Sequence, residues 1–358
     1  MNMKIAIVGA GVLGRLLAFK LKITDPQLDI SLFDKNDENH KSCSAVAAGM
    51  LSPFCELSSS ERTIADLGCE SIEIWKKDVP RIEEISQKKI FFRQNGTLVV
   101  AHRQDLLELK IFQRNIKAKL EPNEHPYKTL RHDEIYAIEP NLERKFHEAI
   151  LFENDGQIDP KSLLEALKTA LEKLNVKMFF GQNINDISEN TINNKHYDAI
   201  FDCRGIEIQA PKIRGVRGEI ITIEMKNFEL NHCIRLIHPR FPLYIAPKGD
   251  GIFVIGATQI ETEDTSNISV RSSLEMLTAI FSINSQFGEG RILETNTQLR
   301  PAFPDNLPRI IRNKNNNFVI GGLYRHGFLI SPKIVDLTMQ SLFDIQIDSR
   351  YLEICFDL

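Results

Sequence analysis

The sequence has few cysteines, no CxxC pair and no unbroken apolar run long enough to cross a bilayer. Its six cysteines are dispersed and form no metal-like cluster with histidine. The apolar run that opens the chain, residues 5–14, is interrupted by glycines. Without a disulfide pattern, a signal peptide or a spanning segment, we expect a cytoplasmic protein with no membrane span and no bound metal.

Positive charge is not in excess either. The chain has 44 Lys and Arg against 48 Asp and Glu, a net charge of −4, so we expect no nucleic-acid partner.

Its 358 residues exceed what one hydrophobic core usually supports. This length predicts two domains, or one large α/β unit with an insertion. Whether the chain forms a homo-oligomer is left open by the sequence.

A glycine-rich motif stands close to the N-terminus. A short run of Ile, Ala and Val at residues 4–8 leads into Gly9, Gly11 and Gly14, spaced G-x-G-x-x-G, and a helical pattern follows. A second strand pattern ends at Asp34, 20 residues beyond Gly14. In this context the first glycine permits a tight turn, the second lets the backbone approach a pyrophosphate, and the third allows close helix–strand packing. Asp34 would accept ribose hydroxyls, which favours FAD or NAD over NADP.

Small side chains then favour FAD over NAD. Residues 42–50 read SCSAVAAGM, and such a run lets the backbone lie against a flat, bulky group. In a plain NAD dehydrogenase, another strand and helix would be expected at this point. A tightly packed helix start without a ligand is the alternative explanation.

The chain resembles the D-amino acid oxidase family of FAD enzymes, and its glycine oxidase group most closely. The resemblance runs in order through nearly the whole chain, in the segments GAGVLGRLLA, AAGML, ENDGQIDPKSLLEAL, YDAIFDCRG, VRGEIITIE, YIAPKGDGIFVIGAT, LRPAFPDNLP and GLYRHGFLISP. It implies an α/β (α+β two-domain) fold: a Rossmann-like FAD-binding domain of the glutathione-reductase type and an antiparallel-sheet substrate domain. The FAD-binding domain would comprise residues 1–85, 150–210 and 308–358, and the substrate domain residues 86–149 and 211–307.

The resemblance also implies a set of cofactor-binding residues. The RPAFPD segment has no cysteine, unlike relatives that attach FAD covalently, so we expect non-covalent FAD. His326 stands where close relatives often have Asn, and it either tunes the flavin or is a hydrogen-bonded structural residue. The residues expected to contact FAD are Gly9, Gly11, Gly14, Asp34, Ser42, Ala47, Ala48, Gly49, Met50, Ile184, Gly205, His326, Gly327, Phe328 and Leu329.

Substrate recognition is expected to depend on arginine, because its planar guanidinium binds a carboxylate in a bidentate way. By resemblance, Tyr244, Arg300 and Arg325 bind the substrate carboxylate and Met50 forms a pocket wall. Apart from the resemblance, a surface salt bridge is the ordinary explanation for Arg300, and a half-buried sheet position for Tyr244. Arg325, between glycines and apolar residues, is expected to lie inside with the substrate carboxylate, rather than a protein acid, as its partner. No residue is expected to act as general base.

Apolar spacing predicts the remaining elements. Serines before residue 62 are expected to cap a helix, and Ser331-Pro332 to start a last helix whose positive end faces the flavin. Helices are expected at residues 11–22, 59–78, 103–118, 160–174, 271–287 and 331–343, and strands at 4–8, 29–33, 90–101, 176–181, 199–203 and 317–322, with an antiparallel sheet over 215–258.

The expected reaction is FAD-dependent oxidation of glycine or a small D- or N-methyl amino acid to the imine, which hydrolyses to an oxo acid and ammonia. Dioxygen would be reduced to hydrogen peroxide, and the resemblance links the activity to thiamine thiazole synthesis. One alternative is a D-amino acid or secondary-amine dehydrogenase that uses another electron acceptor. Others are a flavoprotein that modifies a protein-borne or tRNA-borne amino acid, and one that binds FAD without catalysis.

Overall fold

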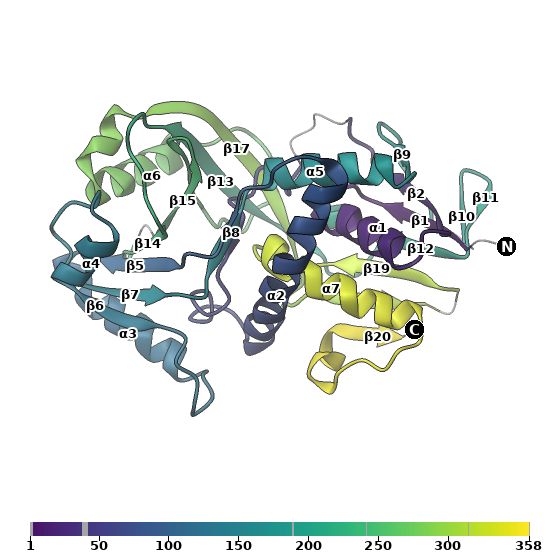
Figure 1. Cartoon of the computed structure of the whole chain (residues 1–358), viewed down its shortest axis with the longest axis horizontal. Helices are drawn as coiled ribbons and strands as arrows, with labels where there is room; N and C mark the ends of the chain where they lie inside the picture. Colours follow the sequence, from purple (N-terminus) through teal and green to yellow (C-terminus); the bar gives the residue numbers. More distant parts are fainter. Residues whose placement is uncertain (1–2, 38–41, 188–189, 241, 314, 358) are drawn as a thin grey trace.

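Two large β-sheets form the molecule, each with its own set of helices (Figure 1). The computed structural model describes residues 3–37, 42–187, 190–240, 242–313 and 315–357. Figure 1 shows α1, α5 and α7 with the first sheet on one side of the molecule, and α3, α4 and α6 with the second sheet on the other. The predicted mixed α/β fold is therefore confirmed, whereas the domain boundaries stay a prediction.

The first sheet contains the N-terminal strand. Neighbouring strands run parallel except for β18 and β19. Its order is β20 (Cys355–Asp357), β18 (Arg309–Arg312), β19 (Asn317–Gly321), β12 (Ala199–Asp202), β1 (Lys4–Val8), β2 (Asp29–Phe33) and β9 (Lys177–Phe179). The sheet thus combines strands from three separate parts of the chain, as the sequence predicted.

Four helices cover one face of this sheet and build the largest core of the protein. They pack on one another in the pairs α1–α5, α1–α7, α2–α5 and α2–α7. Their bounds are α1 (Val12–Thr24), α2 (Arg62–Ser86), α5 (Pro160–Lys173) and α7 (Gly327–Leu342). The start of α5 at Pro160 is as predicted, and the structure adds a cap: the Asp159 carboxylate accepts a hydrogen bond from the Ser162 N–H.

The second sheet has eight strands and is mostly antiparallel. The antiparallel pairing predicted over residues 215–258 is confirmed, and the parallel pair in this sheet joins residues 233–237 to residues 97–101, outside that range. The order is β17 (Arg291–Ala302), β13 (Arg214–Glu224), β16 (Ile252–Gly256), β15 (Leu243–Gly249), β14 (Cys233–Ile237), β5 (Thr97–Ala101), β7 (Glu148–Phe152) and β6 (Lys128–Arg131).

Alternating side chains of β5 show how this sheet is covered on both faces. Leu98 and Val100 join a core with α4 (His132–Ile138) and α6 (Val270–Ile283). Val99 and Ala101 point the other way, into a core with α3 (Leu106–Lys117). The predicted helix at 271–287 ends earlier, at Ile283, and a 3₁₀ turn at Ser285–Glu289 follows it.

A small third sheet connects the two halves of the structure. Its strands are β3 (Met50–Leu51), β8 (Gly156–Ile158) and β4 (Phe92–Arg93). The strand segment expected at 90–101 forms two strands, because it contributes β4 to the small sheet and β5 to the large one. Gly96, with a φ of +94°, lies at the break between them.

The second helix is longer than expected and starts differently. It runs through Pro80 to Ser86, instead of ending near residue 78. Pro80 is exposed, so the Lys76 carbonyl that lacks a helical donor faces water. The N-cap is Glu61 and no side chain caps the helix, so the predicted serine cap is wrong. The hydroxyl of Ser59 instead accepts a hydrogen bond from Arg325, at 2.6 Å.

The last helix starts four residues before the predicted position. It begins at Gly327, and both Ser331 and Pro332 lie inside it. Pro332 has no N–H to donate to the carbonyl of Phe328, the residue four positions earlier. The indole N–H of Trp75, a fully buried residue of α2, donates to this carbonyl at 2.9 Å. A tertiary contact therefore replaces the missing helical bond, and the helix continues through the proline.

None of the helices within the described residues is both long and apolar enough to span a bilayer.

Candidate active site

One cavity of about 530 Å³ is lined by residues of both large sheets and of α7. It brings together every residue that the sequence predicted for cofactor or substrate binding except Gly14. A Cβ at Gly14 would lie 1.9 Å from the Gly9 carbonyl oxygen, which explains why only glycine fits where α1 crosses the first turn. The predicted residues that line the cavity are Gly9, Gly11, Asp34, Ser42, Ala47, Ala48, Gly49, Met50, Ile184, Gly205, Tyr244, Arg300, Arg325, His326, Gly327, Phe328 and Leu329.

One end of the cavity lies at the glycine turn after β1. Gly9 has a φ of +108°, and a Cβ there would be 2.4 Å from the carbonyl oxygen of Cys203. Asp34 lies at the end of β2, where its carboxylate accepts hydrogen bonds from the N–H groups of Ala10 at 2.7 Å and Asn36 at 2.9 Å. Asp34 is thereby positioned in the wall beside the N-terminus of α1, where a nucleotide ribose and phosphates would lie.

Charged residues that the sequence analysis missed surround this end. Arg204 forms an ion pair with Asp202 at 2.7 Å and donates to the Ile184 carbonyl at 2.6 Å. Lys35 and Glu207 form a second ion pair, and both line the cavity. For Arg204, its position beside Gly205 in the CRG segment was the one sequence signal that it lies in the cavity wall. Lys35 and Glu207 had no such signal.

The small-residue loop enters β3 between the two sheets. Lys248 fixes the position of this loop, because its ammonium donates hydrogen bonds to the carbonyl of Ala48 and, at 3.3 Å, to that of Ile158 in β8. Burial lowers the pKa of Lys248. The Ser44 hydroxyl accepts a hydrogen bond from the Val12 N–H at 3.0 Å, so the same loop also covers the N-terminus of α1. Because the side chains of this loop are small, its backbone forms part of the cavity wall.

These features fit FAD. The cavity runs from the glycine turn and Asp34, past the small-residue loop, to the N-terminal residues of α7. Gly9 and Gly11 would let the backbone approach the pyrophosphate, Asp34 would accept the ribose hydroxyls, and the wall at Ala48 and Gly49 would take the flat ring.

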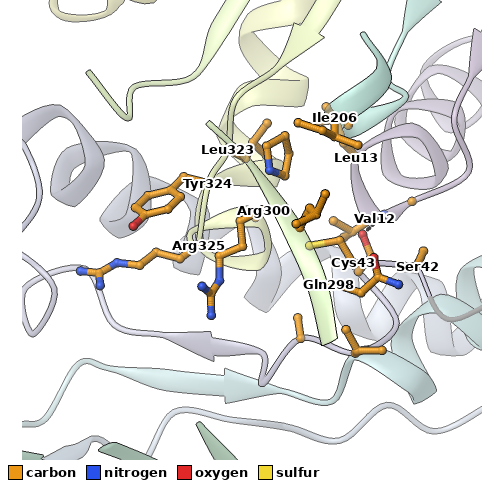
Figure 2. Close-up of a pocket in the computed structure, with 18 of the residues that line it drawn as sticks. Val12, Leu13, Ser42, Cys43, Ile206, Gln298, Arg300, Leu323, Tyr324 and Arg325 are labelled. Carbon is orange, nitrogen blue, oxygen red and sulfur yellow. Dashed lines mark hydrogen bonds between the residues drawn. The ribbon is translucent and has the colours of Figure 1, made fainter. Parts of the chain in front are cut away.

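Arg300 extends from β17 into the other end of the cavity (Figure 2). Within the described part of the chain it donates only to backbone carbonyls, those of Thr258 at 2.9 Å and Arg217 at 3.4 Å. Among the described residues, no carboxylate lies within ion-pair distance of it. Burial lowers its pKa, but a guanidinium remains charged at neutral pH. The surface salt bridge considered for Arg300 is therefore absent from the described structure, and its charge is available to a ligand.

Gly218 of β13 makes room for this guanidinium. A Cβ at residue 218 would lie 2.3 Å from Cζ of Arg300 and 2.4 Å from Nη2. The guanidinium therefore packs against the backbone of β13, in the space that a side chain at residue 218 would fill. The sequence analysis had no signal for this contact.

Arg325 has a partner that the sequence analysis excluded. Its Nη2 lies 2.5 Å from Oε2 of Glu56, so the expectation that it needs no protein acid is wrong. Its side chain is 24% exposed rather than interior. The reason is a long-range contact: Glu56 lies in the turn after β3 and reaches the loop before α7. Figure 2 shows Arg325 next to Arg300, with the Tyr324 ring beside it.

Glu56 is the centre of a buried cluster. The Tyr244 hydroxyl donates to its Oε1, and Nη1 of Arg235 lies 3.6 Å from the same oxygen. Burial alone would raise the pKa of Glu56, but the charges of Arg325 and Arg235 and the Tyr244 hydroxyl hold it at about 2. Two of the three residues predicted to bind a substrate carboxylate thus already contact a carboxylate of the protein.

The two residues beside Arg325 also face the cavity. Burial and the neighbouring Arg325 lower the pKa of His326 to about 3, so its imidazole is neutral. Its ring has no hydrogen bond to a described residue, unlike the structural histidine that was one of two expectations. The hydroxyl of Tyr324 is buried and has no hydrogen-bond partner within the described part of the chain.

A buried carboxyl group lies behind the wall. Asp155 is 1% exposed, and burial raises its pKa to about 8 against the lowering effect of the Thr97 and Ser52 hydroxyls. These two hydroxyl oxygens are 3.1 Å apart, and Ser52 lines the cavity. Asp155 is therefore largely neutral at pH 7.

Comparison with known proteins identifies the family. The DAO family model, described as FAD dependent oxidoreductase, matches residues 4–339. The chain belongs to this family. The predictions of an FAD enzyme of this family and of its oxidoreductase chemistry are therefore confirmed.

Individual relatives agree with this assignment. A Rhizobium etli protein named as a thiamine biosynthesis oxidoreductase, ThiO, is 34% identical over 92% of this chain and 93% of its own length. The bifunctional ThiO/ThiG protein of Trichormus variabilis is 21% identical over 93% of this chain, which spans only 51% of that protein. The glycine oxidase structure from Bacillus cereus has the same fold, with a TM-score of 0.84 at 20% identity over 97% of this chain and 99% of that one.

Proposed function

We propose that this DAO-family protein oxidises glycine or another small D- or N-methyl amino acid to the imine. The imine then hydrolyses to an oxo acid and the free amine, which is ammonia for a primary amino acid and methylamine for an N-methyl one, and dioxygen is reduced to hydrogen peroxide. The observation that carries the proposal is Arg300, a charged guanidinium in the cavity wall without a carboxylate partner among the described residues. The names of the relatives support the same substrate class and a role in thiamine synthesis, and we expect a cytoplasmic enzyme.

Arg300 would bind the substrate carboxylate. Its Nη1 is held by two backbone carbonyls, which orients the planar group and leaves its other donors for a ligand. The unpaired hydroxyl of Tyr324 is a further donor nearby. Carboxylate-binding roles for Tyr244 and Arg325 stay predictions, because both already contact Glu56.

FAD, when bound, accepts the hydride from the substrate carbon. The protein residues would orient the substrate, and neither Glu56 nor His326, the titratable groups beside Arg325, is a good proton acceptor for the substrate amine. With pKa values of about 2 and about 3, Glu56 and His326 hold a proton too weakly. The substrate must then bind as the neutral amine, so we expect kcat/KM to rise with pH towards the pKa of the substrate amine.

Anaerobic mixing with an amine panel tests the proposal. The purified holoenzyme is mixed with glycine, sarcosine, D-alanine or D-proline while the yellow flavin absorption is followed. We expect bleaching by at least one of them, and hydrogen peroxide when air is admitted. Bleaching by none would contradict the proposal. Bleaching without peroxide, together with rapid reduction of an artificial dye, would replace the oxidase by a dehydrogenase.

The attachment of FAD is tested on the same preparation. Acid precipitation should release the yellow cofactor into the supernatant, because we propose non-covalent binding. A yellow protein pellet would overturn this part of the proposal.

A further inference from the structure

The substrate end of the cavity contains two positions for an anion. Arg300 marks the first, where no described carboxylate is present. Arg325 and Tyr244 mark the second, and the carboxylate of Glu56 occupies it. All four side chains line the same cavity, and Figure 2 shows Arg325 next to Arg300, so a ligand at the first position lies near the second.

Glu56 is held firmly in its position. Its side chain is 11% exposed, and Arg235, which lines no part of the cavity, approaches it at 3.6 Å. Its backbone belongs to a tight turn, since the Glu56 N–H donates to the Ser52 carbonyl at 3.2 Å and the Ser60 hydroxyl donates to the Glu56 carbonyl at 3.0 Å. Removing an anion from between two arginines would be costly, because both cations would lose their partner.

A second carboxylate on the substrate would meet this anion. It would have to approach Arg325 beside the Glu56 charge, and like charges close together in a partly buried site repel strongly. A substrate with one carboxylate needs only Arg300 and leaves the Glu56 cluster undisturbed. Without the Glu56 charge, Arg325 in the cavity wall and the buried charge of Arg235 behind it would attract a second carboxylate.

We infer that Glu56 is a specificity-determining residue: its carboxylate fills the second anion position, so the enzyme accepts amines with one carboxylate and rejects those with two. The inference rests on the proposed function for the identity of the substrates. It goes beyond that function by naming what the site excludes and the residue responsible.

Glu56→Gln tests the inference because it removes the charge, while the amide oxygen can still accept from Tyr244. Iminodiacetate and N-ethylglycine form the substrate pair: both are secondary amines, and only the first has a second carboxylate. We expect the ratio of their kcat/KM values, iminodiacetate over N-ethylglycine, to rise by about tenfold or more in Glu56→Gln. Glu56→Asp, which keeps the charge, should stay close to the wild-type ratio.

Ser59→Ala is the matched control. It removes the 2.6 Å hydrogen bond from Arg325 to Ser59 but keeps the ion pair with Glu56. Its substrate ratio should equal that of the wild type. An unchanged ratio in Glu56→Gln, or an equal rise in Ser59→Ala, would overturn the inference. If Glu56→Gln does not fold with FAD, Glu56→Ala carries the same test.

A binding experiment separates this inference from the proposed function. Acetate and malonate are titrated into each holoenzyme, and the change in flavin absorption gives their dissociation constants without turnover. Malonate should gain at least about tenfold over acetate in Glu56→Gln. Failure of the wild type to oxidise any amine would contradict the proposed function alone, whereas an unchanged malonate preference would contradict the role of Glu56.

Discussion

Gly218→Ala should displace the Arg300 guanidinium and so weaken substrate binding, although Arg300 itself is not substituted. The new Cβ would lie 2.3 Å from Cζ of Arg300, and ordinary contact begins near 3.4 Å, so the guanidinium must retreat by roughly 1 Å. The backbone need not move, because the clashing atoms are the far end of a flexible side chain. Gly218 has no positive φ, so alanine introduces no backbone strain. The fold and bound FAD should therefore be retained.

The expected loss follows from the displacement. A misplacement of about 1 Å in a substrate-positioning group costs about 10²-fold, or about 2.7 kcal/mol of transition-state stabilisation. We expect kcat/KM for glycine to fall by about 10²-fold, mainly through a higher KM. The assay is steady-state peroxide release, with FAD content and thermal unfolding measured on the same preparation.

Gly215→Ala is the control for Gly218→Ala. Gly215 lies on the same strand, where a Cβ would be 3.1 Å from Cδ1 of Leu299 and 3.3 Å from Cγ of Glu263, a tight but tolerable fit. Its kcat/KM should stay within about threefold of the wild type, a difference of about 0.7 kcal/mol. Equal losses in both variants, or full activity in Gly218→Ala, would refute the assignment of the carboxylate to Arg300.

Three further outcomes are expected. Trp75→Phe leaves the buried Phe328 carbonyl without a donor, so denaturant unfolding should show a loss of about 1–3 kcal/mol and titration a weaker affinity for FAD; unchanged values would remove Trp75 from the support of α7. Burial raises the pKa of Asp155 to about 8 in the folded state, against about 4 in the unfolded chain. Its contribution to the free energy of unfolding is therefore complete below pH 4. It is lost as the pH rises to 8, by up to about 1.4 kcal/mol per pH unit. Asp155→Asn should therefore gain stability relative to the wild type from pH 5 to pH 8, and parallel pH profiles would contradict this. The rise of kcat/KM with pH should persist in Glu56→Gln, and its disappearance would make Glu56 the proton acceptor.

Local patterns in the sequence predicted the strand–glycine turn–helix arrangement and the position of Asp34, whereas their role in binding a nucleotide stays a prediction. The strand, the glycines and Asp34 lie within the first 34 residues, and their spacing is set by backbone sterics that depend on near neighbours. The start of α5 was equally local, since the Asp159 cap and Pro160 act within one turn of the helix.

Proline and serine signals failed where a distant residue overrode them. Pro332 should start a helix, yet Trp75 compensates for its missing N–H, and the helix begins at Gly327. The serines before α2 should cap it, yet Ser59 binds Arg325 instead. Both outcomes depend on contacts between residues more than two hundred positions apart, which no window of sequence contains.

The amino-acid sequence by itself determined that a glycine turn follows the first strand, that three separate segments combine into one sheet and that arginines lie near the C-terminal end. Only the tertiary structure decided which of these arginines has no carboxylate partner among the described residues and can bind a ligand carboxylate. Arg325 is paired with Glu56, whereas Arg300 lies against Gly218 with no carboxylate partner among the described residues. The physical reason is that the partner of a buried charge is chosen by proximity in space, and the fold, not the spacing along the chain, brings Glu56 to Arg325.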